Sequence, residues 1–92
     1  MLRHKILMIV NPISGKGRKQ RIETLRRLIE ESELDINLQI TTYAGEGEKI
    51  AKNGIENGIK HFIAVGGDGT VNEIGRAIYL TPETSLGIIP TG

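Results

Sequence analysis

Four apolar segments of strand length alternate along this chain with three segments whose apolar residues recur at helical spacing. The strand-like segments cover residues 5–10, 35–43, 61–65 and 85–89, and the helical segments cover residues 18–32, 46–58 and 71–81. Alternation of this kind predicts a parallel sheet with right-handed crossovers and helices on both of its faces. We therefore expect an α/β fold, a Rossmann-like three-layer parallel sheet in the order β-α-β-α-β-α-β.

Length and composition narrow the class of protein. With 92 residues the chain has room for one domain. Aromatic residues make up only 3%, which argues against base-stacking surfaces and hence against a nucleic-acid partner. The absence of cysteine excludes disulfides and thiol chemistry and fits a cytoplasmic protein. The apolar part of the N-terminal segment "MLRHKILMIV" is too short to span a membrane, so we interpret it as the first strand.

The second strand has one face less buried than the first. Ile36, Leu38 and Ile40 alternate with polar residues, which predicts that the second strand lies near an edge of the sheet. In the second helix we expect Gly54 to weaken the helix and Gly58 to end it.

We expect the fourth strand to be buried. No helical segment follows it, so we expect residues 1–92 to be the N-terminal part of a longer protein.

The segment Gly66-Gly67-Asp68-Gly69-Thr70 joins the third strand to the third helix. Glycine permits positive φ angles and a close approach of a ligand to the backbone, and a helix N-terminus attracts phosphate. Thr70 could cap the helix or donate its hydroxyl to a phosphate oxygen. A carboxylate beside phosphate is explained if Asp68 holds Mg²⁺ or accepts a proton from an attacking hydroxyl. The alternative is that Asp68 only caps the helix.

The loop after the first strand, "NPISGKG", faces the same edge of the predicted sheet. Its serine could bind phosphate or cap the following helix, and Lys16, Arg18 and Lys19 add positive charge. The loop is neither a G-x-x-x-x-G-K-[ST] phosphate-binding loop nor a G-x-G-x-x-G dinucleotide motif, because Arg18 and Gln20 occupy the required positions. Considered alone, this loop is weak evidence for phosphate binding.

Two further residues are candidates by position. Thr42 follows the second strand and could contact a nucleotide, or it could be an ordinary strand residue. Glu73 lies one turn into the third helix and could reach a ribose or a metal-bound water, or it could be a plain surface glutamate.

Charge is unevenly distributed although the net charge is only +1. Residues 1–27 carry a formal charge of +7 and the remainder carries −6. This asymmetry predicts an anionic partner near the first loop and the first helix. A solvated helix face is the alternative, which we prefer for Arg26 and Arg27 considered alone.

The segments "VNPISGKG", "GGDGTVNE" and "GIIPTG" together resemble the catalytic domain of diacylglycerol kinases, in particular the small bacterial lipid kinases. The resemblance spans essentially the whole chain. The glycine-aspartate motif is shared more distantly with NAD kinases and phosphofructokinases, whereas Asn72 and Glu73 directly after it favour the lipid kinases. The last family motif is cut at Gly92, before the threonine that usually contacts ATP.

The resemblance implies an N-terminal nucleotide-binding domain, a C-terminal β-rich domain and ATP in the cleft between them. It implies ATP-binding roles for Asn11, Pro12, Ile13, Ser14, Gly15, Thr42, Gly66, Gly67, Asp68, Gly69, Thr70, Val71, Asn72 and Glu73. Asp68 would serve the phosphates and Mg²⁺, and in NAD kinases the equivalent aspartate is instead the proposed base.

The function expected is ATP- and Mg²⁺-dependent phosphorylation of a lipid hydroxyl such as that of diacylglycerol, by a protein that is cytoplasmic or peripheral at the membrane. We expect residues 1–92 alone to be inactive. An NAD kinase-like or other small-molecule kinase and a stand-alone nucleotide-binding module are the alternatives. The oligomeric state stays open, with a homodimer among the possibilities.

Overall fold

The computed structural model describes residues 5–12 and 17–90, and within them the seven expected elements follow one another in the expected order. The strands are β1 (Lys5–Val10), β2 (Asp35–Ile40), β3 (His61–Gly66) and β4 (Ser85–Pro90). The helices are α1 (Arg18–Ser32), α2 (Glu46–Glu56) and α3 (Asp68–Ile78). The third helix begins three residues earlier than the apolar spacing predicts, so Asp68 lies in its first turn.

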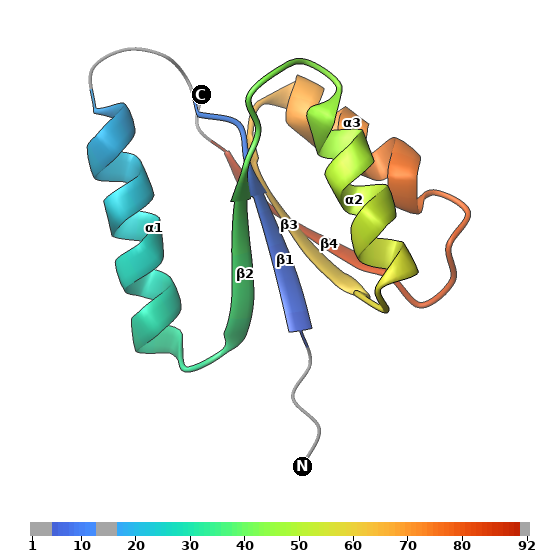
Figure 1. The fold of residues 1–92 in the computed structure, drawn as a ribbon, viewed down its shortest axis with the longest axis horizontal. Helices are drawn as coiled ribbons and strands as arrows, with labels where there is room; N and C mark the ends of the chain where they lie inside the picture. Colours follow the sequence, from blue (N-terminus) through green and yellow to red (C-terminus); the bar gives the residue numbers. More distant parts are fainter. Residues whose placement is uncertain (1–4, 13–16, 91–92) are drawn as a thin grey trace.

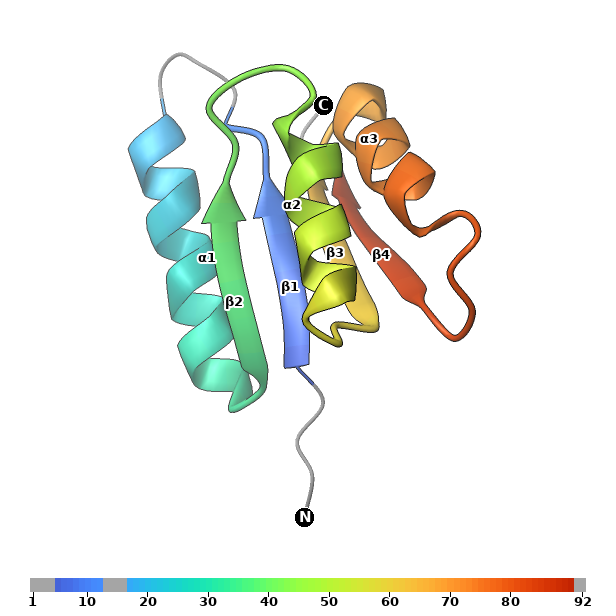
Figure 2. The same cartoon turned by 45° about the vertical axis from the view of Figure 1, so that its right-hand side comes forward.

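All strand pairs in the sheet are parallel, and the strand order is β2-β1-β3-β4. The edge position predicted for β2 is therefore confirmed. The chain moves outward from β1 to β2 through α1, and then crosses back over β1 to reach β3 and β4. Because right-handed crossovers that run in opposite directions lie on opposite faces, α1 covers one face and α2 and α3 cover the other (Figures 1 and 2).

The sheet has an apolar core on each face, as the period-two alternation of β1 requires. Leu7 and Ile9 point toward α2 and α3, whereas Met8 and Val10 point toward α1. The first core contains Leu7, Ile9, Ala51, Phe62, Ala64 and Ile74, and the second contains Met8, Val10, Leu25 and Val65. The predicted three-layer α/β fold is thus confirmed.

Two glycines of the α2 region have different structural roles. Gly54 is buried, and a Cβ atom there would lie 2.8 Å from Leu7 Cδ2 and 3.3 Å from Phe62 Cε2. It therefore lets the helix approach the sheet closely, a role that its weak helix propensity does not suggest. Gly58 has a φ of 85° and its N–H donates to the carbonyl of Ile55, so it ends the helix as predicted.

The expectation of a buried fourth strand is wrong for most of β4. Ile88 is 53% exposed and Ile89 is 39% exposed. β4 is an edge strand, and the two residues lie on opposite faces of it: Ile88 shares the α3 face with Leu86, and Ile89 lies on the side of α1. The core beneath α1 is built from residues of α1, β1, β2 and β3 and does not extend to β4, which leaves Ile89 partly exposed.

Candidate functional site

The site lies at the carboxyl ends of β1, β2 and β3, which meet at one edge of the sheet because the strands are parallel and in register. A cavity of about 320 Å³ opens there, lined by Asn11, Pro12, Thr41, Thr42, Tyr43, Ala44, Gly67, Gly69, Thr70 and Glu73. The chain leaves β1 in one direction and β3 in the other at this point. Ligands of open α/β sheets bind at such a reversal.

A second, larger groove of about 380 Å³ is less suited to the predicted chemistry. It lies between α2 and the exposed side of β2. Its lining includes Lys5, Asp35 and Asn37, so it extends to the amino ends of β1 and β2. Among the described residues that line it, none belongs to the first turn of a helix. We therefore place the candidate site in the smaller cavity.

Seven of the residues predicted from the sequence come together around this cavity: Asn11, Pro12, Thr42, Gly67, Gly69, Thr70 and Glu73. Four other predicted residues are not among those that line it: Gly66, Asp68, Val71 and Asn72. Val71 packs against the core, and with Asn72 it lines a separate groove beside β4. Ile13, Ser14 and Gly15 lie outside the described residues.

The N-terminus of α3 borders the cavity, which its first-turn residues Gly69 and Thr70 line, whereas no residue of α2 lines it. Gly45 and Gly67 occupy the N-cap positions, and neither helix has a side-chain hydrogen bond from its N-cap residue. The first N–H groups of an α-helix lack partners within the helix and carry partial positive charge. The first turn of α2 already carries Glu46 and Glu48, and its Gly47 N–H is bound by Glu73, so it is the N-terminus of α3 that favours an anionic ligand.

Thr70 is the most informative polar residue of the site. It is only 3% exposed, and its hydroxyl makes no hydrogen bond with another described residue. A buried hydroxyl without a partner is costly, so it normally has a functional or structural reason. As a lining residue of the cavity, Thr70 can satisfy its hydroxyl by donating to a ligand oxygen.

The glycines before Thr70 provide space and not unusual backbone angles. A Cβ atom on Gly66 would lie 2.6 Å from Thr70 Oγ1 and 3.0 Å from Thr70 Cβ, so this glycine makes room for the threonine. Added Cβ atoms on Gly67 and Gly69 would meet no atom within 4 Å. None of the three has a positive φ, so the expectation that they adopt backbone angles reserved for glycine is wrong. The expectation that they let a ligand approach the backbone closely is compatible with this geometry.

Asp68 is exposed in the first turn of α3, and its carboxylate makes no hydrogen bond or ion pair with another described residue. The N-cap position belongs to Gly67, so the interpretation of Asp68 as the helix cap is wrong. Its charge is favourable beside the helix N-terminus. A single free carboxylate fits Mg²⁺ that arrives with phosphate oxygens, since Mg²⁺ is commonly held by one or two carboxylates and the substrate phosphates.

The wall formed by residues 41–44 is ordered by two separate contacts. The backbone N–H and the hydroxyl of Thr42 both donate to Glu46 Oε1, the latter over 3.1 Å. Thr41 is buried, and its backbone N–H donates to the carbonyl of Val10 over 2.8 Å. These contacts hold the β2–α2 connection over the end of β1.

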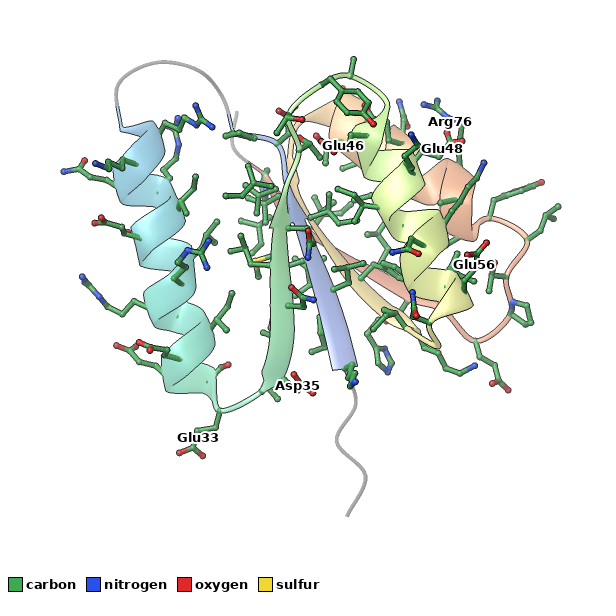
Figure 3. All side chains as sticks on the ribbon, in the orientation of Figure 1. Glu33, Asp35, Glu46, Glu48, Glu56 and Arg76 are labelled. Atoms are coloured by element: carbon green, nitrogen blue, oxygen red, sulfur yellow. The ribbon has the colours of Figure 1, made fainter. Side chains whose placement is uncertain are left out.

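Glu73 is half-buried and is not a plain surface residue. Its Oε1 accepts a hydrogen bond of 2.9 Å from the backbone N–H of Gly47 in the first turn of α2. One turn further along, Arg76 Nε lies 2.9 Å from Glu48 Oε1, and Figure 3 shows these two side chains facing each other from α3 and α2. The two helices are therefore joined at the end that borders the cavity.

Sequence reasoning missed Thr41, Tyr43 and Ala44, which line the cavity beside Thr42. The available signal was their position, because the whole connection from β2 to α2 lies at the predicted ligand edge. In the described part of the chain, no three His, Cys, Asp or Glu side chains gather closely enough to hold a metal ion unaided. No helix in that part has the length and apolar character needed to cross a membrane.

Comparison with known proteins identifies the family. Residues 5–92 match the profile of the diacylglycerol kinase catalytic domain. This chain belongs to the diacylglycerol kinase catalytic-domain family. A diacylglycerol kinase of Staphylococcus saprophyticus is 33% identical over 93 residues, which cover 99% of this chain and 30% of that protein. A YegS-like lipid kinase of Pectobacterium atrosepticum is 33% identical over 92 residues, which cover 94% of this chain and 29% of that protein.

A solved structure from the family has the same fold. The crystal structure of a diacylglycerol kinase from Bacillus anthracis matches with a TM-score of 0.80 and 28% sequence identity, covering 97% of this chain and 33% of that one. The chain thus spans about a third of the length of these family members. The sequence motifs that carried the predicted resemblance are those of this family.

Proposed function

We propose that this chain supplies the nucleotide-binding part of an ATP- and Mg²⁺-dependent lipid kinase, which transfers the γ-phosphoryl group of ATP to a lipid hydroxyl such as that of diacylglycerol. The observation that carries the proposal is the buried hydroxyl of Thr70, which has no hydrogen-bond partner among the described residues and lines a cavity beside the N-terminus of α3. Family membership supports the lipid acceptor. The diacylglycerol kinases named above support it in the same way.

Phosphoryl transfer depends mainly on positioning and charge neutralisation, which this cavity is built to provide. The first N–H groups of α3 and the hydroxyl of Thr70 would donate to phosphate oxygens. The open space beside Gly67 and Gly69 would let those oxygens reach the backbone. Asn11 and Thr42 lie across the cavity and would contact the rest of the nucleotide. Asp68 would hold Mg²⁺, which neutralises phosphate charge when bound.

The choice of acceptor separates this proposal from its nearest alternative. Purified protein expressed from its own complete gene is incubated with MgATP labelled at the γ-phosphate, and with either diacylglycerol in detergent micelles or NAD. We expect label in the lipid and none in NAD. Label in NAD alone would replace the lipid kinase with an NAD kinase, and binding of MgATP without transfer to either would favour a binding module.

A lipid acceptor requires that the protein reach a membrane surface, and the charges of α1 support this. Arg18 and Lys19 occupy its first turn, whereas Glu30 and Glu31 occupy its last turn. This distribution opposes the helix dipole, which favours anions at the N-terminus and cations at the C-terminus. The exposed cations at the start of α1 would attract anionic lipid headgroups.

Sedimentation with lipid vesicles tests this docking. We expect the protein to sediment with vesicles containing anionic phospholipid and to remain in solution with zwitterionic vesicles. Replacing Arg18 and Lys19 by Gln should weaken vesicle binding about thirtyfold, because each basic residue near the surface contributes about 1 kcal/mol. Replacing Lys49 and Lys60 by Gln removes the same charge elsewhere and should have little effect. Equal losses from both pairs would contradict a role specific to α1.

A further inference from the structure

Helix α2 begins without a side-chain cap of its own. Its N-cap residue, Gly45, has no side chain and a φ of 92°. Glu46 at the first helical position turns back to Thr42, so it does not satisfy an N–H group within the helix. The N–H of Gly47 is instead accepted by a carboxylate from another helix, Glu73 of α3, over 2.9 Å.

The sequence at this contact is suited to that arrangement. Gly47 is buried, and a Cβ atom there would lie 2.8 Å from Glu73 Oε1. Any other residue at this position would therefore compete with the carboxylate for the same space. A carboxylate also interacts favourably with the positive end of the α2 dipole.

A second contact keeps the two helices aligned. Glu48 is in an ion pair with Arg76 of α3 over 2.9 Å, and with Lys52 of α2 over 3.0 Å (Figure 3). The side chains of Lys52 and Arg76 are 60% and 63% exposed, so the pairs are weak individually. The less exposed Glu73–Gly47 contact is the closer of the two to the cavity, which Glu73 itself lines.

We propose that Glu73 is a positioning residue, which fixes the N-terminus of α2 through the N–H of Gly47 and thereby holds the 41–44 wall of the cavity in its ligand-binding position. The inference rests on the proposed nucleotide-binding function. It differs from the sequence-based expectation that Glu73 contacts a ribose or a metal-bound water. In this role the carboxylate acts through α2, and an uncharged acceptor of the same shape can replace it.

Four variants separate positioning from direct contact, with affinity for MgATP measured by calorimetry and the Gly47 amide exchange rate by NMR. Glu73→Ala should lower the affinity about tenfold and speed Gly47 exchange, because a charge-assisted hydrogen bond is lost. Glu73→Gln keeps an acceptor and should stay within about threefold of the unsubstituted protein. Gly47→Ala should behave like Glu73→Ala, since it displaces the carboxylate. Gly75→Ala, a helix glycine whose Cβ would meet no atom, should leave both unchanged.

The double variant Glu73→Ala with Gly47→Ala gives the sharpest result. We expect it to bind MgATP no more than about twofold more weakly than Glu73→Ala alone, because two changes that break one contact are not additive. Multiplied effects, an unchanged Gly47 exchange rate in Glu73→Ala, or equal loss in Glu73→Gln would each overturn the positioning role. If the unsubstituted protein fails to bind MgATP, the proposed function fails, and the Gly47 exchange rates still decide whether Glu73 fixes α2.

Discussion

Replacement of Asp68 by Asn tests the chemistry at the start of α3 with little disturbance of the fold. The side chain is exposed and has no hydrogen-bond partner among the described residues, and Asn has nearly the same shape. The expected cost is therefore the loss of a favourable charge near a helix N-terminus, about 0.3–1 kcal/mol of unfolding free energy. Urea unfolding of both proteins measures this difference.

The effect on phosphoryl transfer should be much larger than the effect on stability. If Asp68 holds Mg²⁺ or accepts a proton, turnover should fall by about a hundredfold or more, which is the range for a positioned acid–base group. Affinity for ATP without metal should be unchanged or higher, because a negative charge beside the phosphates has been removed. Turnover at saturating Mg²⁺ and ATP affinity with and without Mg²⁺ are the measurements needed.

The combination of results identifies the role of Asp68. We expect turnover and the Mg²⁺-dependent gain in ATP affinity to be lost together, which assigns Asp68 to the metal. Loss of turnover with the Mg²⁺-dependent gain intact would assign it to proton transfer instead. Near-normal turnover in a folded Asp68→Asn protein would refute both roles, and a stability loss well above 1 kcal/mol would contradict its solvent-exposed position.

Three further changes test the surroundings of the site. Gly67→Val should abolish ATP binding, because the valine side chain would fill the space through which phosphate approaches the backbone. The fold should be kept, because the φ of −95° at Gly67 is accessible to other residues, and circular dichroism checks this. Normal binding in an ATP titration would contradict the approach of phosphate to Gly67. Gly66→Ala should lower the free energy of unfolding by about 1–3 kcal/mol, because the added methyl group crowds Thr70. An unchanged midpoint of urea unfolding would contradict that packing. Arg76 and then Lys52 hold the pKa of Glu48 below its ordinary value of 4.5, so Glu48→Gln should destabilise the protein at neutral pH. That difference should vanish as the pH falls through the lowered pKa, and a difference that persists in acid would contradict the ion pairs.

Local patterns were sufficient to predict the order of the elements and the edge of the sheet that carries the site. The alternation in Ile36, Leu38 and Ile40 placed β2 at an edge, and parallel strands necessarily end at one side. The start of α3 was less predictable. Gly67 and Gly69 suggested a loop, whereas the helix already begins at Asp68, because its packing against the sheet outweighs the low helix propensity of glycine.

Contacts between elements distant in the sequence could not be predicted from local patterns. Glu73 caps α2 only because α2 and α3 lie side by side on one face of the sheet. Gly54 similarly looks unfavourable within its helix until the side chains of Leu7 and Phe62 are placed beneath it. The exposure of Ile89 depends on where α1 lies, which the composition of β4 does not indicate.

The central claim is that MgATP binds in the cavity at the carboxyl ends of β1, β2 and β3. NMR mapping on the isotopically labelled protein tests it most directly. Titration with MgATP should shift the backbone amides of Thr42, Gly67, Gly69 and Thr70, whose residues line the cavity. Amides around the larger groove, such as that of Asn53, should not move. Shifts confined to the larger groove, or no shifts at saturating MgATP, would contradict the assignment of this cavity as the nucleotide site.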